Sequence, residues 1–416
     1  MLKPAVLLVA LLAAGVSDAR AADAGKWVGT WSASPQPAMP GAVTNFSGQS
    51  VRLIVHTSIG GTKVRIRISN TYGTQPLIIG AAHVARAGSG AETRAGTDRV
   101  LYFGGRPSVT IAPRQTVTSD TSTLDVPALS NLAVSLYFPK DAPATTAHHL
   151  ALQTNYTTAG DVTAVDSLPD ARKIDSWPFL TGVDVLAPDN AGTIVLFGDS
   201  TVDGDGSTAD TNRRWSDQFA ARLQRIASGK AFGVLNQGII GNRLLRGSPA
   251  DSKGQFGAAF GEAGTARFAR DVLGQSGVTH VIVRIGINDI GFPGSFDAGA
   301  KPVTPEAMIE GFRALVAQAH AKNIRIIATT LTPFSGTQAD KNYFSPEKEG
   351  VRKKVNQWLR TTKEFDGLVD LDATLRDPAH VTQFLPEFDS GDHLHPSNAG
   401  YAASAAAVDM TLLTGK

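Results

Sequence analysis

The sequence predicts two structural parts, a β-sandwich followed by an α/β unit with a parallel sheet, and three observations support this. The chain has 416 residues, which is longer than one ordinary domain. In its first part, short apolar segments are separated by clusters of Gly, Pro, Ser and Asp, with no helical periodicity of useful length. In its second part, short apolar segments alternate with amphipathic ones. We therefore place a β-sandwich at residues 26–170 and an α/β domain at residues 186–416.

The clearest strand signal of the first part lies around Gly60 and Gly61. The segments Ser50–Ile59 and Thr62–Asn70 flank these glycines, and Val or Ile alternates with Arg in the second segment. This period-two pattern around a two-residue glycine turn predicts a β-hairpin. Further predicted strands are Leu77–Ile79, Ser108–Ile111, Thr116–Ser119 and Asn131–Phe138.

The second part alternates strands and helices. The predicted strands are Thr193–Phe197, Ala231–Leu235, His280–Ile285, Arg325–Thr330 and Leu368–Leu371. The predicted helices are Trp215–Ile226, Ala266–Leu273, Pro305–Ala321 and Glu347–Thr362, with a last helix after Pro396. Thr304 and Pro305 fit an N-cap and a first helical position. Short apolar strands that alternate with helices predict a parallel sheet covered on both faces.

The composition excludes some classes of partner and chemistry. The 39 basic and 37 acidic residues give a net charge of +2, and no basic run occurs, so we expect no nucleic-acid partner. The chain has no cysteine, which excludes a disulfide, a cysteine nucleophile and a thiolate metal site.

The first 22 residues resemble a targeting signal rather than part of a fold. Lys3 gives a positive start, residues 5–16 are apolar, and Ala19-Arg20-Ala21 offers small residues to a signal peptidase. We expect a signal peptide at residues 1–22 and a secreted or periplasmic protein; an uncleaved membrane anchor is the alternative. The apolar stretch is short for a bilayer, and no later segment is apolar enough to span one, so we expect no stable membrane insertion.

Polar clusters follow several of the predicted strands. Ser200 comes directly after the first strand, in TIVLFGDS, and Gly241 follows the second, in LNQGIIGNRLL. Asn288 follows the third, in RIGINDIG, and both Asp392 and His395 lie in SGDHLHPSNAGY before the last helix. Ligand sites of parallel α/β sheets lie outside the carboxyl ends of the strands. We expect these five residues to meet at that edge.

These residue types together suit acyl transfer. A serine hydroxyl is a weak nucleophile and needs an adjacent base, which His395 can supply. Asp392 can orient the imidazole and stabilise its protonated form. The backbone N–H groups of Ser200 and Gly241 and the side-chain amide of Asn288 are candidate oxyanion donors, each worth roughly 3–4 kcal/mol. We expect no cofactor or metal.

These segments resemble the four sequence blocks of the SGNH, or GDSL-type, hydrolase family. GDS at 198–200 matches the nucleophile block, Gly241 the glycine block, GIND at 286–289 the third and DHLHP at 392–396 the last, in the family's order. The resemblance implies a flavodoxin-like fold and esterase or lipase activity. WVGTWSASPQ at 27–36 is similar to the start of a β-domain in a two-domain bacterial subgroup. Asp203, in GDSTVDG, departs from the small or polar residue usual there.

Several other polar residues have a structural interpretation. We expect Asp199 to support the nucleophile turn and Asp289 to hold its loop. Histidine is a common metal ligand, but the D-x-H and G-N-H-[DE] segments of metallophosphatases are absent, so we do not assign a metal to His393 and His395. Arg243 and Arg246 either line the cleft or solvate a helix face.

The segment VDGDGSTAD contains three acidic residues, at 203, 205 and 210. It fails the EF-hand pattern because Thr208 replaces the glycine and no Glu ends it, so we interpret it as a solvated acidic loop beside the site. His148 and His149 are interpreted as surface residues. Trp27 and Trp31 are interpreted as core residues of the β-domain rather than as a sugar platform.

The leading hypothesis is a secreted serine esterase that forms an acyl-enzyme at Ser200. An aromatic content of 7% and the lack of a long apolar lid favour short acyl groups, such as acetyl groups on carbohydrates. The alternatives are a lysophospholipase or lipase for longer chains, a non-catalytic glycan-binding protein, and a metal-dependent phosphoesterase. The role of the β-domain and the oligomeric state stay open.

Overall fold

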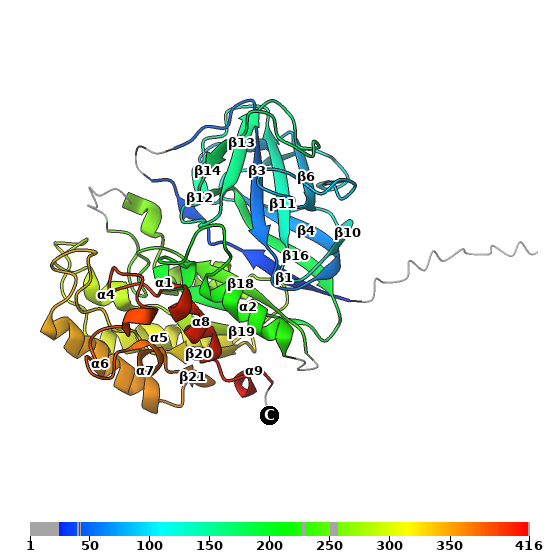
Figure 1. Ribbon diagram of the computed structural model, residues 1–416. Helices are drawn as coiled ribbons and strands as arrows, with labels where there is room; N and C mark the ends of the chain where they lie inside the picture. Colours follow the sequence, from blue (N-terminus) through cyan, green and yellow to red (C-terminus); the bar gives the residue numbers. More distant parts are fainter. Residues whose placement is uncertain (1–24, 40, 42, 227–229, 250–256, 415–416) are drawn as a thin grey trace, which may run out of the picture.

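The computed structural model describes residues 25–39, 41, 43–226, 230–249 and 257–414. A β-rich N-terminal part lies against an α/β part formed by the rest of the chain, drawn above and below in Figure 1. The signal peptide predicted at residues 1–22 lies outside the described residues. None of the described helices is long and apolar enough to cross a bilayer.

The N-terminal part is built from antiparallel strands. They are β1 (Lys26–Ser32), β2 (Gln36–Pro37), β3 (Gln49–His56), β4 (Gly61–Ser69), β5 (Leu77–Ile79), β6 (Ala81–Arg86), β7 (Arg99–Val100), β8 (Val109–Ile111), β9 (Thr116–Thr118), β10 (Ser122–Val126), β11 (Asn131–Phe138), β12 (Thr146–His148), β13 (Asn155–Ala159), β14 (Arg172–Ile174), β15 (Trp177–Pro178) and β16 (Leu180–Ala187).

Two sheets of these strands enclose one apolar core and confirm the predicted β-sandwich. One sheet has the order β1-β16-β4-β10, with β9 also on β4, and the other has the order β14-β13-β3-β11-β6-β7. Val64 and Ile66 of the first sheet and Leu53 and Val55 of the second are fully buried in the shared core. Strand β16 pairs with both β1 and β4, so the antiparallel sheets continue past residue 170 to Ala187.

The hairpin predicted around Gly60 and Gly61 is wrong. Strands β3 and β4 lie in different sheets, because β3 pairs with β11 and β13 while β4 pairs with β16, β10 and β9. The chain crosses between the sheets at this point. The backbone groups of each strand pair with strands that are distant in the sequence, and a local turn signal cannot reveal such partners. A Cβ on Gly60 would lie 2.6 Å from the carbonyl oxygen of Val126, so the crossing also needs glycine for space.

The α/β part contains one parallel sheet and the helices around it. Its strands are β17 (Gly192–Gly198), β18 (Phe232–Gly238), β19 (Val278–Arg284), β20 (Arg325–Thr329) and β21 (Gly367–Val369). Its helices are α1 (Ser200–Asp203), α2 (Trp215–Arg225), η1 (Gly257–Phe260), α3 (Gly264–Phe268), η2 (Ala269–Leu273), α4 (Ile287–Gly291), α5 (Pro305–His320), α6 (Pro346–Thr361), α7 (Leu371–Leu375), η3 (Pro386–Phe388), α8 (Asn398–Ala406) and α9 (Thr411–Thr414).

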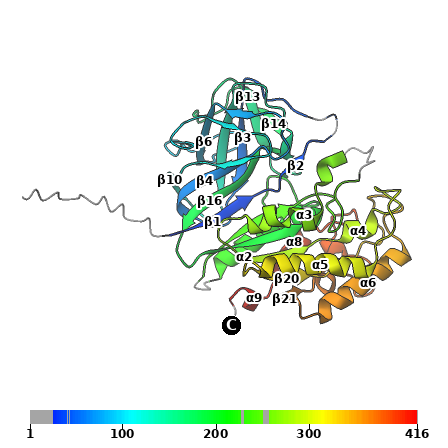
Figure 2. The ribbon, with the colours of Figure 1, turned by 180° about the vertical axis from the view of Figure 1, so that it is seen from behind.

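The order of the parallel sheet is β18-β17-β19-β20-β21. In order of appearance this is 2-1-3-4-5, the flavodoxin-like order, so the predicted fold is confirmed. Successive residues of β17 face opposite sides of the sheet. Ile194 and Leu196 pack with α2 and α8, whereas Val195 and Phe197 share a core with α5 and α6 (Figure 2). The central strand is therefore buried on both faces, and its carboxyl end is held rigidly.

The β-sandwich covers the edge of the parallel sheet at β18. The N–H of Val234 donates to the Ser58 Oγ over 2.9 Å, and the Ser32 Oγ donates to the carbonyl oxygen of Asn236 over 3.1 Å. A Cβ on Gly233 would lie 2.0 Å from the carbonyl oxygen of Gly29, so the two backbones meet there in direct contact. An exposed edge strand would otherwise offer unpaired backbone groups. The N-terminal part thus rests on the strand that leads to Gly241.

Candidate active site

Ser200 is the first residue of α1, directly beyond the carboxyl end of β17. The Asp199 carboxylate caps this short helix by accepting hydrogen bonds from the N–H of Thr201 over 3.0 Å and from its hydroxyl over 2.7 Å. A Cβ on Gly198 would lie 1.9 Å from the carbonyl oxygen of Arg284 in β19, so the turn requires glycine there. In the sequence GDS, the glycine therefore allows β17 to approach β19 closely, the aspartate caps α1, and the serine presents its hydroxyl at the start of that helix.

Ser200, His395 and Asp392 form one hydrogen-bonded chain. The Ser200 hydroxyl lies 2.8 Å from His395 Nε2, and His395 Nδ1 lies 2.5 Å from Asp392 Oδ2. A carboxylate only accepts, so Nδ1 carries the proton and Nε2 is free to accept from the hydroxyl. Asp392 Oδ1 in turn accepts from the N–H groups of Leu394 and His395 over 2.9 and 2.8 Å. The loop before α8 thus orients the imidazole toward Ser200.

Carboxylates around His395 favour its protonated form. Burial lowers the pKa of His395, but the hydrogen bond to Asp392 and the charges of Asp205 and Asp392 outweigh burial, so the pKa is raised above 6.5. Asp205 Oδ2 lies 3.6 Å from His395 Nε2, on the side of the ring that faces Ser200. Burial would raise the pKa of Asp392, but its bonds from His395 and Leu394 hold that pKa below its ordinary value.

This arrangement predicts the acid side of the pH profile. A general base must be neutral, so kcat/KM should fall as pH drops through the raised pKa of His395. Asp205→Asn removes one of the charges that raise this pKa, and the acid limb should move to lower pH. The measurement is kcat/KM against pH for the wild type, for Asp205→Asn and for the control Asp210→Asn, whose carboxylate binds Thr154 instead. An acid limb that stays in place in Asp205→Asn would contradict this effect of Asp205.

Gly241 and Asn288 supply two further candidate donors. Gly241 has a φ of +70°, and a Cβ there would lie 2.1 Å from the Phe260 ring, so only glycine fits. Among the described residues, the N–H groups of Ser200 and Gly241 have no hydrogen-bond partner. The Asn288 Nδ2 donates to the carbonyl oxygen of Asn242 over 2.9 Å, which occupies one of its two hydrogens.

Tyr343 fixes the orientation of the Asn288 amide, and the sequence analysis missed it. Its hydroxyl donates to Asn288 Oδ1 over 2.6 Å. Burial raises the pKa of Tyr343 well above its ordinary value, so the phenol stays a donor at any working pH. No spacing in the sequence marks this tyrosine, which lies 55 positions from Asn288.

Asp289 and Arg243 support the loop that carries Gly241. The Asp289 carboxylate accepts from the N–H groups of Leu244 and Leu245 over 2.6 and 2.9 Å, in line with the structural role expected for it. Burial raises the pKa of Asp289 to about 6, against the effect of these two bonds. Arg243 is buried and pairs with Asp297 over 2.7 Å, so it does not solvate a helix face.

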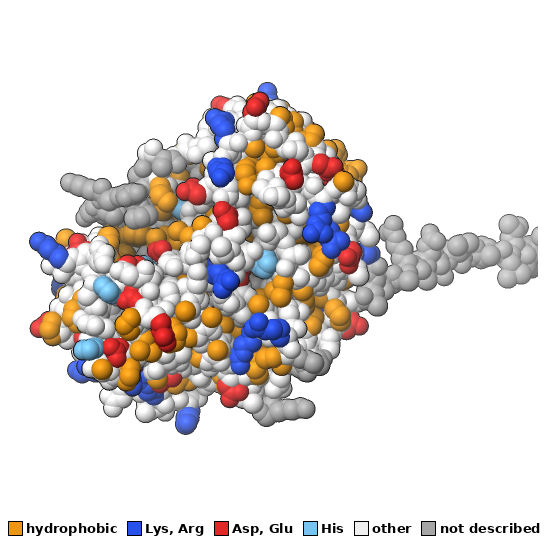
Figure 3. Space-filling view, in the orientation of Figure 1, with side chains coloured by type: hydrophobic (Ala, Val, Ile, Leu, Met, Phe, Trp, Pro, Cys, Tyr) orange, Lys and Arg blue, Asp and Glu red, His pale blue; other side chains and the backbone are white. Residues whose placement is uncertain are grey.

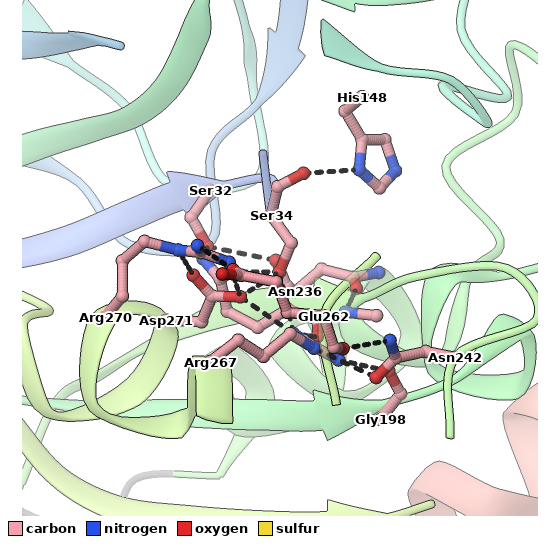
Figure 4. Close-up of polar contacts among 12 residues, drawn as sticks. Ser32, Ser34, His148, Gly198, Asn236, Asn242, Glu262, Arg267, Arg270 and Asp271 are labelled. Carbon is pink, nitrogen blue, oxygen red and sulfur yellow. Dashed lines mark hydrogen bonds and ion pairs between the residues drawn. The ribbon is translucent and has the colours of Figure 1, made fainter. Parts of the chain in front are cut away.

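Arg267 is a second residue that the sequence analysis missed. Its guanidinium is fully buried and donates to the carbonyl oxygen of Gly198 over 2.7 Å and to Asn242 Oδ1 over 3.0 Å (Figure 4). It also reaches Ser34 Oγ of the N-terminal part over 3.1 Å and Asp271 over 2.9 Å. Burial lowers the pKa of Arg267, and Asp271 opposes this effect. One buried cation thus links the nucleophile turn, the Gly241 loop and the β-sandwich.

Two expectations about polar residues near Ser200 are wrong. Asp203 is not part of a solvated loop, because only 2% of it is exposed, and His148 is not a surface residue, because only 3% of it is exposed. The two side chains pair with each other over 2.8 Å at the junction of the two parts. The polar neighbours of each residue in the sequence predict exposure, whereas each is buried against a partner 55 positions away.

The remaining aromatic and histidine residues have simple environments. Trp31 is buried in the sandwich core against Trp177, as expected, whereas Trp27 is partly exposed and carries the Arg65 guanidinium 4.4 Å from its ring. His393 is exposed and pairs with Asp389 over 2.6 Å. Within the described ranges, no group of three or more His, Asp or Glu side chains could hold a metal ion.

Phenylalanine side chains gather beside Gly241 and Asn288. Phe260, which limits the space at Gly241, packs against Phe292 in a tilted arrangement and against Phe296 edge to face, at centroid distances of 5.3 and 6.3 Å. Tyr343 contacts Phe292 and Phe296, each at 6.2 Å. Phe296 is 39% exposed, while Phe260 and Phe292 are buried. One of the aromatic clusters of the described residues thus lies beside Gly241 and Asn288.

A model of the family described as GDSL-like Lipase/Acylhydrolase matches residues 196–403, which is half of the chain. The matched region starts in β17 and contains Ser200, Gly241, Asn288, Asp392 and His395. The chain belongs to the GDSL-like lipase/acylhydrolase family. The resemblance noted in the four sequence blocks is therefore confirmed, and this GDSL-like protein is a hydrolase that acts on esters.

Three solved structures are similar to about half of the chain. A lipase/acylhydrolase from Enterococcus faecalis is 21% identical, with 52% of this chain and 92% of that chain covered and a TM-score of 0.36. An aryl esterase from M. smegmatis is 17% identical, with 52% and 95% covered and a TM-score of 0.39. A GDSL-like lipase from Bacteroides thetaiotaomicron is 14% identical, with 54% and 89% covered and a TM-score of 0.36. No curated protein matches this GDSL-like chain.

Proposed function

We propose that this protein is an exported serine esterase that hydrolyses carboxylic esters through an acyl-enzyme on Ser200. The observation that carries the proposal is the continuous hydrogen-bonded chain from Asp392 through His395 to the Ser200 hydroxyl. Such a chain activates a serine because the imidazole takes the proton as the oxygen attacks.

The proposed reaction has two halves. His395 Nε2 accepts the proton of Ser200 as Oγ attacks the ester carbonyl, and the oxyanion accepts hydrogen bonds from the N–H groups of Ser200 and Gly241 and from Asn288 Nδ2. Collapse of this intermediate expels the alcohol, which takes the proton from His395. A water molecule, deprotonated by His395, then attacks the acyl-enzyme, and the bond to Ser200 Oγ breaks as Oγ takes the proton back from His395, which releases the acid and the free serine. Asp392 stays ionised throughout and stabilises the imidazolium.

We propose short acyl groups, such as acetyl groups on carbohydrates, as the preferred substrates. Support comes from the space beside the oxyanion donors, where the Phe260 ring contacts Gly241 and packs against Phe292. Neighbouring aromatic rings that contact one another leave little room for a long chain there. We propose only the class of the alcohol, from the predicted signal peptide and the small net charge of +2.

The test is a series of p-nitrophenyl esters, from acetate to dodecanoate, in excess EDTA. We expect acetate or butyrate to give a higher kcat/KM than octanoate, and EDTA to leave the rates unchanged. Faster turnover of octanoate would favour a lysophospholipase or lipase. Loss of activity in EDTA would favour a metal-dependent enzyme, and glycan binding without turnover of any ester would favour a binding protein.

Export is proposed on the N-terminal segment alone. The full chain, expressed in a bacterium with a periplasm, should be recovered there with a mass that corresponds to cleavage near Ala21 or Ala22. Recovery of the uncleaved chain in the membrane fraction would support the anchor instead, and an uncleaved protein in the cytoplasm would contradict both.

A further inference from the structure

His148 of the β-sandwich lies against the nucleophile helix. It ends strand β12, its side chain is 4% exposed, and its ring lies 5.7 Å from that of Trp177. Its Nδ1 lies 3.0 Å from the carbonyl oxygen of Ser34, a contact drawn in Figure 4. Its Nε2 lies 2.8 Å from Oδ1 of Asp203, the last residue of α1.

The partners of His148 require a charged ring. A carbonyl oxygen and a carboxylate both accept hydrogen bonds, so both ring nitrogens of His148 donate, and only an imidazolium has two donors. Burial and the nearby Arg214 lower the pKa of His148, but Asp203 and the Ser34 carbonyl outweigh them and the pKa is raised. The result is a buried ion pair that joins the two parts of the molecule.

Asp203 also binds the loop that carries Gly241. Its second oxygen, Oδ2, accepts from the N–H of Ile240 over 3.0 Å, and Ile240 directly precedes Gly241. Asn236 Nδ2, at the end of β18, donates to the carbonyl oxygen of Asp203 over 3.2 Å. One carboxylate thus binds the β-sandwich with one oxygen and the loop of a proposed oxyanion donor with the other.

We propose that His148 is a positioning residue, which acts through Asp203 to hold the N–H of Gly241 at the oxyanion. The inference rests on the proposed esterase function and gives the β-sandwich a task in catalysis. A shift of the Gly241 N–H weakens a bond that forms fully only in the transition state. It should therefore lower kcat and leave KM nearly unchanged.

Two substitutions separate this role from a merely structural one. The amide nitrogen of glutamine can replace the Nε2 donor, whereas the shorter asparagine can replace only the Nδ1 donor to Ser34. His148→Gln therefore keeps the bond to Asp203, and His148→Asn loses it. A contact that only stabilised the fold would not distinguish kcat from KM in this way.

The matched control is His149→Asn. His149 is the next residue, it is partly buried, and its Nε2 bonds to the carbonyl oxygen of Pro37 over 2.7 Å, within the β-sandwich. His149 directly follows strand β12, and no bond between it and Asp203 is present among the described residues. His149→Asn therefore tests whether the loss of a neighbouring histidine that does not bind Asp203 also lowers kcat.

The experiment measures kcat and KM for p-nitrophenyl acetate, with the melting temperature of each variant. We expect His148→Asn to lower kcat about tenfold to a hundredfold with little change in KM, and His148→Gln and His149→Asn to stay within about threefold of the wild type. Equal kcat values in His148→Asn and His148→Gln, or a change confined to KM, would overturn the inference.

A second variant carries the test if His148→Asn does not fold. Asp203→Ala removes both acceptor oxygens, so His148 Nε2 and the N–H of Ile240 both lose their partner and kcat should fall at unchanged KM. A kcat equal to that of the wild type would overturn the inference. These failures differ from failure of the proposed function, which would show as a wild type without ester turnover, or as turnover that survives Ser200→Ala.

Discussion

Ser200→Ala is expected to lower kcat for p-nitrophenyl acetate by roughly 10⁴-fold to 10⁶-fold. The variant retains the proposed oxyanion donors, but His395 then has no hydroxyl to activate. The lost hydrogen bond to His395 is worth about 1 kcal/mol, so the protein should stay folded. Initial rates of p-nitrophenolate release in excess EDTA, corrected for the rate without protein, measure the effect.

Ser207→Ala is the matched control for this substitution. Ser207 is another buried serine of the same segment, and its hydroxyl has no hydrogen-bond partner among the described residues. We expect it to retain the wild-type rate. If Ser200→Ala kept more than a small fraction of the activity, the nucleophile would lie elsewhere and the reaction proposed here would fail.

Asn288→Ala is expected to lower kcat by roughly 10²-fold to 10³-fold, with a much smaller change in KM. The Asn288 amide is held by Asn242 on one side and by the Tyr343 hydroxyl on the other, so its free hydrogen has a fixed direction. A donor that is already oriented stabilises the developing charge without further reorganisation. Its loss should therefore appear in kcat, measured with saturating p-nitrophenyl acetate.

Tyr343→Phe tests the same donor indirectly. The phenyl ring can keep the contacts with Phe292 and Phe296, while Asn288 Oδ1 loses its partner. We expect a smaller fall in kcat than for Asn288→Ala, of about tenfold. If Asn288→Ala retained the wild-type kcat, groups other than Asn288 would stabilise the oxyanion. The role proposed for Tyr343, which acts through Asn288, would then be contradicted as well.

Local sequence signals were enough to locate most elements of the α/β part. The strand predicted at Thr193–Phe197 is observed as Gly192–Gly198, and the helix predicted at Pro305–Ala321 as Pro305–His320. Apolar runs, N-caps and prolines act within a few residues, so they are visible in a sequence. Strand pairing is not local, and for this reason the glycine turn at Gly60 suggested a hairpin where the chain crosses between two sheets.

The same distinction holds for the site. Ser200, Gly241, Asn288, Asp392 and His395 stand in short motifs at strand ends, and the structure brings Ser200, Asp392 and His395 into one hydrogen-bonded chain. Arg267, Tyr343 and His148 stand in no motif. A buried charge is costly unless partners meet it, and most partners of these three residues come from distant segments of the chain.

The distribution of charged side chains on the surface bears on how a substrate could be recognised. On the face drawn in Figure 3, basic and acidic side chains are interspersed rather than gathered into a field of one sign. Selection of substrate through long-range attraction would need such a field. We therefore expect recognition to depend on the immediate surroundings of Ser200, where Asp205 lies 3.6 Å from His395 Nε2.

The most direct test of the central claim is to label the nucleophile with a p-nitrophenyl alkylphosphonate, which forms an ester that water removes slowly. The account predicts release of one p-nitrophenolate per protein molecule, loss of esterase activity in parallel, and a phosphonyl group found by mass spectrometry on the peptide that contains Ser200. Full activity after complete reaction with the reagent, or a phosphonyl group on a different residue while Ser200 stays free, would contradict it.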